Sequence, residues 1–118
     1  AFTASDIAFH FSAPAVEDEV EVDAETRREV FMVFKEGVNN IVRHSRCTKA
    51  EIDLAIERNW LRLKLSDNGR GFDVSEASSG NGLSSMRRRA RKLGGDLEIG
   101  STSSAGTTVM LKAPLRRS

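Results

Sequence analysis

The longest periodic segment of the chain runs from Ala24 to about Arg43. Its apolar residues recur at every third or fourth position, the spacing that places them on one face of a helix. Asp23 directly precedes the segment, and an aspartate there accepts a hydrogen bond from the free backbone N–H groups of the first turn. The pattern predicts a capped amphipathic helix with an apolar face made of Val30, Phe34, Val38, Ile41 and Val42, with Phe31 beside them.

Alternating apolar residues predict strands on both sides of this helix. Asp6–Ser12 shows the alternation clearly, and Val20–Val22 shows it over a shorter length. Lys49–Arg58 alternates as well, and after Asn59 leucines occupy every second position, which predicts a β-hairpin. Two more strands are expected near the end of the chain, at about Asp96–Ser101 and Thr107–Ala113.

A second, shorter helix is predicted between Leu83 and about Leu93. Leu83, Met86, Ala90 and Leu93 share its apolar face, and Gly94-Gly95 provides the stop. The stretch from Asp67 to Gly82 is rich in glycine and serine and predicts a loop. The order of elements predicts an α+β fold, a two-layer α/β sandwich in which helices cover one face of a mixed, mostly antiparallel sheet.

Length and composition narrow the class of protein. A chain of 118 residues and 13.0 kDa predicts one domain over residues 1–118, and 18 basic against 17 acidic residues favour neither a nucleic acid nor a membrane as partner. The single Cys47 excludes an internal disulfide, and no apolar run approaches the roughly 20 residues of a membrane span. We expect a cytoplasmic domain. Its start at Ala1 rather than Met predicts excision from a longer parent, which could be membrane-anchored.

The polar face of the long helix carries unusual residues. Glu36, Asn40 and His44 are spaced at i, i+4 and i+8 and form one stripe, while Gly37 and adjacent asparagines disfavour a helix. A carboxylate and a carboxamide one turn apart both offer oxygen to Mg²⁺, and His44 or Arg43 would then meet a phosphate. An ordinary polar face on an amphipathic helix explains the same residues equally well.

Glycines gather at two places that suit phosphate binding. Asp67 ends a predicted strand and is followed by Gly69 and Gly71, whose backbones turn sharply or approach a ligand closely. Gly80-Asn81-Gly82-Leu83 leads directly into a helix, where free N–H groups and the helix dipole favour anions. The spacing matches neither the P-loop nor the dinucleotide-binding motif, and the ligand ladder of a calcium loop is absent.

Taken in order, these motifs resemble the GHKL ATPase superfamily. Glu36–Asn40 matches its N box, Asp67–Gly71 its G1 box, Gly80–Leu83 its G2 box, and Gly106-Thr107 its last conserved turn. The resemblance covers nearly the whole chain and implies the Bergerat ATP-binding fold. The Gly-Leu-x-x-Met-Arg-x-Arg-Ala-x-x-Leu-Gly-Gly stretch is most similar to bacterial sensor histidine kinases of the DesK and NarX class, which typically have a short ATP lid.

The resemblance implies ATP and Mg²⁺ as cofactors and assigns roles to residues. Asp67 would accept a hydrogen bond from the adenine amino group, with Thr107 in support. Asn40 would bind Mg²⁺, and Glu36 would act as, or orient, a base near the γ-phosphate. The phosphates would lie near Arg43 and His44, the lid hinge at Gly69 and Gly71, and the backbone donors at Gly80, Gly82 and Leu83.

The resemblance also implies that the phosphate acceptor lies elsewhere. In such kinases the acceptor histidine belongs to a separate dimerisation domain, and a response regulator follows it in the pathway. His10 lies in a predicted strand and His44 in the nucleotide helix, so neither has the setting of an acceptor. An anti-sigma-factor-type serine kinase of the same fold is the alternative.

The run Arg87–Lys92 raises a third possibility, a nucleic-acid-binding module. On a helical wheel Arg88 and Lys92 point away from the apolar face, while Arg87 and Arg91 flank it. The run contains no aromatic residue, and the net charge of the chain is only +1. We therefore expect a solvated face with one arginine near the phosphates and no direct contact with nucleic acid.

Overall fold

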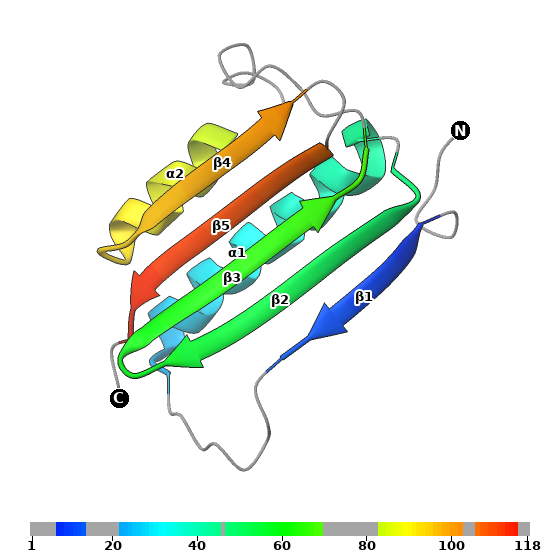
Figure 1. Ribbon diagram of the computed structural model, residues 1–118. Helices are drawn as coiled ribbons and strands as arrows, with labels where there is room; N and C mark the ends of the chain where they lie inside the picture. The colour runs from blue at the N-terminus through cyan, green and yellow to red at the C-terminus, as the bar shows by residue number, and fades with distance from the viewer. Residues whose placement is uncertain (1–6, 14–21, 46, 70–82, 103–105, 116–118) are drawn as a thin grey trace.

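The computed structural model describes residues 7–13, 22–45, 47–69, 83–102 and 106–115. Within them the chain forms five strands and two α-helices, and the first helix continues into a wider π-helical turn (Figure 1). In chain order the elements are β1 (Ala8–Ser12), α1 (Ala24–Asn40), η2 (Ile41–Ser45), β2 (Lys49–Glu57), β3 (Trp60–Asp67), α2 (Leu83–Lys92), β4 (Asp96–Thr102) and β5 (Gly106–Pro114).

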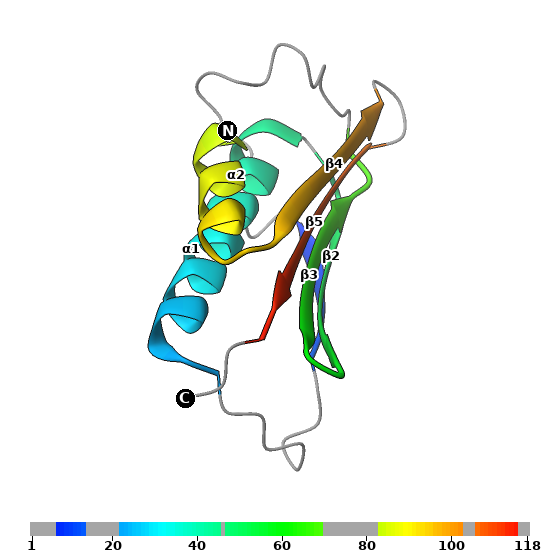
Figure 2. The same ribbon diagram turned by 90° about the vertical axis from the view of Figure 1, so that its left-hand side faces the viewer.

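The strands form one sheet in the order β1-β2-β3-β5-β4. The pair β1–β2 is parallel and the other three pairs are antiparallel. Both helices lie on the same face of the sheet, and the opposite face is open (Figure 2). The predicted α+β two-layer sandwich with a mostly antiparallel sheet is therefore confirmed.

Most of the predicted strands are present in the structure. The hairpin turns at Arg58 and Asn59, where Arg58 has a φ of 56°, and Glu57 pairs with Trp60 across the turn. The strand predicted at Val20–Val22 is not confirmed, because Val22 belongs to no strand and the two residues before it lie outside the described residues. The predicted stop of α2 is confirmed, since Gly94 and Gly95 donate backbone hydrogen bonds to carbonyls of its last turn.

The core lies between the helices and the inward side chains of the sheet. Leucines of β3 at alternate positions face it, as the pattern predicted, and so do the inward residues of the neighbouring strands. From α2, the predicted face of Leu83, Met86, Ala90 and Leu93 is buried in full. The sheet contributes Ala50, Ile52, Leu61, Leu63, Leu65, Leu97, Val109 and Leu111.

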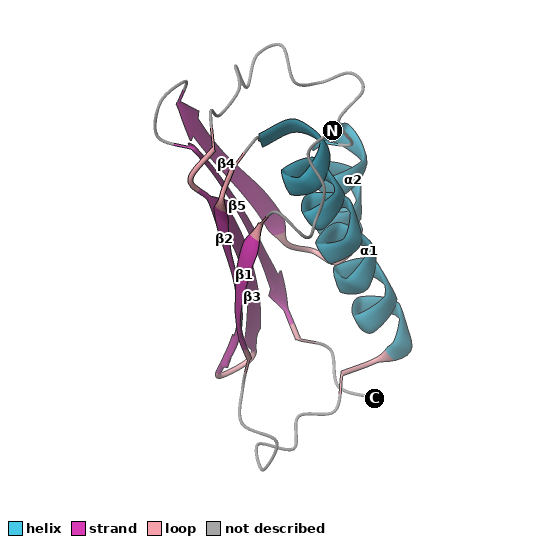
Figure 3. Cartoon of the chain, turned by 90° about the vertical axis from the view of Figure 1, so that its right-hand side faces the viewer, coloured by secondary structure: helices cyan, strands magenta, loops and turns pink. Residues whose placement is uncertain are grey.

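The buried face of the first helix differs from the predicted one in part. Of the predicted residues, Ile41 is buried in η2, and Val30, Phe34, Val38 and Val42 are partly buried and packed against the core. The residues of α1 that are buried are Thr26, Glu29, Val33 and Gly37. Phe31, expected beside the apolar face, is 57% exposed. The reason is that α1 packs against α2 on one side and lies mainly over β3, so the side turned toward α2 is the deeper one (Figures 2 and 3).

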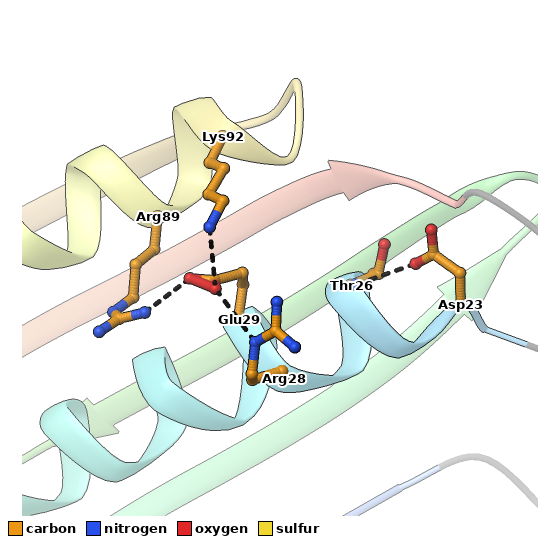
Figure 4. A network of polar contacts seen from close by, with 6 residues as sticks. All are labelled: Asp23, Thr26, Arg28, Glu29, Arg89 and Lys92. Atoms are coloured by element: carbon orange, nitrogen blue, oxygen red, sulfur yellow. Dashed lines mark hydrogen bonds and ion pairs between the residues drawn. The ribbon is translucent and has the colours of Figure 1, made fainter.

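Glu29 is the centre of a charged network between the two helices (Figure 4). Its side chain is 3% exposed, and Arg89 Nη1 lies 2.6 Å from its Oε1. Lys92 Nζ and Arg28 Nε lie 3.7 and 3.8 Å from Oε2. Lys92 is exposed, as expected of a residue that points away from the apolar face, and its ammonium group also lies within ion-pair distance of Glu29.

The surroundings of Glu29 keep it ionised. Burial alone raises the pKa of a carboxyl group, but the hydrogen bond from Arg89 and the charges of Lys92, Arg89 and Arg28 together lower the pKa of Glu29 below its ordinary value. The carboxylate thus joins α1 to α2 through charge-assisted contacts.

Candidate functional site

Four elements reach the same end of the sandwich. β3 ends there at Asp67, and β5 begins beside it, with Thr107 paired to Asp67 in the sheet register. In all three ribbon views α1 runs toward this end, where Asn40 is its last residue, and α2 starts from it at Leu83 (Figures 1, 2 and 3). Residues from all four predicted motifs are therefore gathered at one end of the sheet.

Asp67 is half-buried and held in a defined orientation. Its Oδ1 accepts a hydrogen bond from the backbone N–H of Gly69 over 2.8 Å, and the backbone N–H of Thr107 also bonds its carboxylate. Burial raises the pKa of Asp67, and these two backbone hydrogen bonds offset only part of that rise. The result is a partly desolvated carboxylate, which is a strong acceptor for a ligand N–H group.

Gly106 supports Asp67 from the next strand. It has a φ of 87°, a conformation that L side chains rarely adopt, and its α-carbon lies against the backbone of Asp67. A β-carbon at this position would overlap the Asp67 carbonyl oxygen. The close approach of β5 to the end of β3 therefore requires glycine here.

We expect Gly106→Ala to damage both the fold and the site. The strained φ and the overlap with Asp67 should lower the free energy of unfolding by about 2 kcal/mol or more, and a displaced Asp67 should weaken nucleotide binding. Urea unfolding and calorimetric titration with ATP measure the two effects. Gly100→Ala in β4 is the control, because a β-carbon there meets no atom within 4 Å. Equal behaviour of the two variants would contradict the role of Gly106.

The end of α1 departs from the prediction in its backbone. The predicted helix extends to about Arg43, but the α-helix stops at Asn40 and a π-helical turn follows over Ile41–Ser45. The N–H of Ile41 bonds the carbonyls of both Gly37 and Val38. A wider turn rotates the residues after Asn40 relative to those before it, so the regular stripe predicted over Glu36, Asn40 and His44 is interrupted before His44.

Gly37 brings this part of α1 close to the sheet. A β-carbon built on it would lie 2.9 Å from Cδ2 of Leu65, the inward residue two positions before Asp67 in β3. Glu36 and Asn40, one turn apart on either side of Gly37, are both partly exposed, and Arg43 in the π-helical turn is exposed. The helix thus presents polar side chains next to the strand that carries Asp67.

The remaining predicted site residues divide into two groups. Leu83 is described, buried and the first residue of α2, so the free N–H groups of that helix terminus belong to the same end of the sandwich as Asp67. Gly71, Gly80 and Gly82 lie outside the described residues, as does the side chain of His44.

The carboxamide of Asn40 is a candidate ligand for a metal ion at this end. Within the described part of the chain no three His, Cys, Asp or Glu side chains lie close enough to hold a metal together. Mg²⁺ commonly takes only one or two protein oxygens and completes its shell with phosphate and water. The carboxamide oxygen of Asn40 fits that role.

For two residues at this end of the sheet, Gly106 and Asn68, the sequence predicted membership of a motif but no individual role. Gly106 was part of a conserved turn, and Asn68 was only the residue between Asp67 and Gly69. Asn68 accepts from the N–H groups of Thr48 and Lys49 through Oδ1, 3.0 Å from each. An asparagine immediately after a strand is the one available signal, because its amide readily bonds nearby backbone groups.

The sandwich, the half-buried carboxylate at a strand end and the helix terminus beside it define an ATP-binding domain of the two-layer α/β type. Residues 25–117 match the family of histidine kinase-, DNA gyrase B-, and HSP90-like ATPases, and the chain belongs to that family. The predicted membership of the GHKL superfamily is therefore confirmed, whereas the assignment to the DesK and NarX class stays a prediction.

The relatives that the chain resembles in sequence include a sensor histidine kinase and sensor proteins. The chain is 38% identical to the sensor histidine kinase LiaS of Bacillus subtilis over 87 residues, which are 73% of this chain and 24% of LiaS. It is 36% identical to the sensor protein VraS of Staphylococcus saprophyticus over 101 residues, 85% of this chain and 29% of VraS. The chain thus spans about a quarter of the length of these relatives.

Solved structures of histidine kinases share the fold. The blue-light activated histidine kinase EL346 of Erythrobacter litoralis matches with a TM-score of 0.78 at 22% identity, over 93% of this chain and 36% of that one. The Acinetobacter baumannii histidine kinase AdeS matches with a TM-score of 0.75 at 18% identity, over 95% of this chain and 56% of that one.

Of the helices that the structure describes, none is long and apolar enough to cross a membrane.

Proposed function

We propose that this chain is the catalytic domain of a sensor histidine kinase, which binds Mg-ATP and donates the γ-phosphoryl group to a histidine on a separate dimerisation domain of the same kinase. The observation that carries the proposal is the Asp67–Thr107 pair at the end of the sheet toward which α1 brings Asn40. The names of the relatives, sensor histidine kinase and sensor protein, support a place in two-component signalling.

In this proposal Asp67 binds the adenine end of the nucleotide. The 6-amino group of adenine donates a hydrogen bond to this carboxylate, and Thr107 supports it from β5. The desolvation that raises the pKa of Asp67 also strengthens such a bond, because fewer water molecules compete for the carboxylate. Gly69 and Gly71 give the backbone the turn that leads away from the base.

The phosphate end of the nucleotide is bound between the end of α1 and the start of α2. Asn40 offers its carboxamide oxygen to Mg²⁺, which when bound neutralises phosphate charge. In this proposal Arg43 and His44 would contact the phosphates from the end of the first helix. Leu83, with Gly80 and Gly82 before it, would offer the free N–H groups and the positive dipole end of α2 to the same anion.

The chemical step needs little covalent help from the protein. The bond between the γ-phosphorus and the β–γ bridging oxygen breaks, ADP leaves with that bond's electron pair, and the unprotonated nitrogen of the acceptor imidazole forms the new P–N bond. Glu36 acts as, or orients, a base near this reaction. Positioning and charge neutralisation provide most of the catalysis.

Two other functions are less well supported. A serine kinase of the anti-sigma-factor type shares the fold, but the relatives found are sensor proteins. A nucleic-acid-binding role for Arg87–Lys92 loses its basis, because Arg89 bonds Glu29 and Arg87 Nη1 donates to the carbonyl of Leu97 over 3.4 Å. We propose a cytoplasmic setting and, beyond the dimerisation domain, a response regulator as indirect partner.

Phosphoryl transfer from ATP labelled at the γ-phosphate tests the proposal. The chain alone should not label itself on histidine, because His10 lies on β1 and His44 belongs to the nucleotide helix, so neither has the setting of an acceptor. Addition of a separately made dimerisation domain of the same kinase should restore transfer weakly, since the linkage is cut. Acid-labile label on the chain alone would point to a self-contained kinase instead.

The same assay separates the roles of the two helix residues. Asn40→Ala should reduce both ATP binding and transfer by about tenfold or more, because the metal loses a ligand. Glu36→Ala should reduce transfer by about 100-fold with little change in ATP affinity, as expected for a base. Glu25→Ala, in the first turn of the same helix, is the control and should change neither. An equal loss of ATP affinity in Asn40→Ala and Glu36→Ala would contradict the separate roles of metal ligand and base.

A further inference from the structure

Asn68 ties the end of β3 to the start of β2 through four hydrogen bonds. Its Oδ1 accepts from the backbone N–H groups of Thr48 and Lys49, 3.0 Å from each. Its Nδ2 donates to Oγ1 of Thr48 over 3.1 Å, and its own backbone N–H donates to the carbonyl of Lys49 over 3.1 Å. The side chain of Asn68 is therefore bound to both Thr48 and Lys49, and its main chain to Lys49.

Asn68 is also the middle residue of the turn that orients Asp67. The carboxylate of Asp67 accepts from the N–H of Gly69, so the direction of this carboxylate depends on the conformation of the residue between them. Strand ends open easily where their hydrogen bonds are few. The bonds of Asn68 to Thr48 and Lys49 hold this turn at a point where β3 has already ended.

The two residues that Asn68 bonds, Thr48 and Lys49, are themselves joined to the sheet. The carbonyl of Thr48 accepts from the N–H of Ala8 in β1, and Lys49 begins β2. On its other side Asp67 is paired with Thr107 and touched by Gly106. Asp67 is thus held from β5 by backbone contacts and from β2 by its ladder pairing with Ala50, and Asn68 extends the link to Thr48 and Lys49 beyond the end of β3.

We propose that Asn68 is a positioning residue for adenine selection: it holds the Asp67–Gly69 turn so that the Asp67 carboxylate meets the 6-amino group of the base. This inference rests on the proposed function, in which Asp67 binds adenine. Asn68 itself touches no part of the nucleotide and acts only through Asp67. Its loss therefore weakens the contact to the 6-amino group and spares the contacts to ribose and phosphates.

The test compares the binding of ATP with that of inosine triphosphate, a purine nucleotide without the 6-amino group. Each nucleotide is titrated calorimetrically into the 118-residue chain in the presence of Mg²⁺. Asn68→Ala should weaken ATP binding by about fivefold and leave inosine triphosphate binding unchanged. Thr48→Val removes only the bond from Asn68 Nδ2 and should weaken ATP binding by about twofold. Asn59→Ala, in the hairpin turn at the other end of the sheet, should change neither affinity.

A double variant distinguishes action through Asp67 from a general effect on the fold. On an Asp67→Asn background, Asn68→Ala should cause no further loss of ATP affinity, because the contact that it positions is already lost. An equal loss for both nucleotides, or an additive loss in the double variant, would overturn the positioning role. If the unaltered chain bound both nucleotides equally, the adenine contact itself would be wrong, a failure of the proposed function that this comparison shows separately.

Discussion

Asp67→Asn is expected to weaken ATP binding by about tenfold or more, because a neutral amide oxygen accepts a hydrogen bond less strongly than a carboxylate. The new amide N–H₂ group would also face the adenine amino group, donor against donor. Calorimetric titration of the variant with ATP and with GTP gives the measurement. A variant that bound ATP normally and discriminated against GTP as before would show that Asp67 does not bind the base.

The same substitution should not destabilise the fold at neutral pH. Because burial raises the pKa of Asp67, its contribution to stability is present below its ordinary value of 3.8 and is lost as the pH rises through the raised value in the folded chain. An uncharged asparagine avoids that loss. The variant should therefore gain stability relative to the unaltered chain between acid and neutral pH, as measured by urea unfolding at several pH values. A variant much less stable at pH 7 would contradict this sign.

Arg89→Met should lower the free energy of unfolding by about 3 kcal/mol, the size expected when one partner of a buried ion pair is removed. Glu29 would remain buried with only Lys92 and Arg28 at more than 3.5 Å. Urea unfolding at pH 7 measures the loss. Arg88→Met is the matched control, since Arg88 is exposed on the same helix and should change stability by about 0.5 kcal/mol or less.

The pH dependence of this second variant has a definite sign. Because the pKa of Glu29 is lowered, the network contributes stability above the ordinary value of 4.5 and loses it as the pH falls through the lowered value. The difference between Arg89→Met and the unaltered chain should therefore shrink in acid. A double variant, Glu29→Leu with Arg89→Met, should recover much of the loss. Equal stability of the Arg88 and Arg89 variants would contradict the importance of the network.

The strands and the second helix were predictable because their patterns are local. Alternation through the leucines of β3, and the spacing of Leu83, Met86 and Ala90 in α2, are set by which face of each element meets the core. The burial of Glu29 was not predictable, because it depends on where α2 crosses α1. A glutamate is almost never buried without a partner, and its partner Arg89 lies sixty residues further along the chain.

In the candidate site, too, features set by local sequence were predictable, and features set by contacts between distant elements were not. Asp67, Glu36 and Asn40 were identified because the residue type and the order of motifs carry the signal, although their roles stay predictions. The π-helical turn after Asn40 leaves no periodic signal, since it changes the hydrogen bonds of one turn only. The contacts of Gly106 and Asn68 depend on which strands become neighbours, which the pattern of either strand alone does not contain.

The position of β5 inside the sheet has a consequence for biosynthesis. Of the strands that the structure describes, β5 is the last to be synthesised and lies between β3 and β4, so Asp67 meets Thr107 only after residues 106–114 have left the ribosome. A nascent chain that ends before Gly106 has α1 and the hairpin but lacks Thr107, the neighbour of Asp67. If Asp67 binds adenine as proposed, nucleotide binding requires β5 in the sheet, and bound nucleotide favours the complete sheet over its opening.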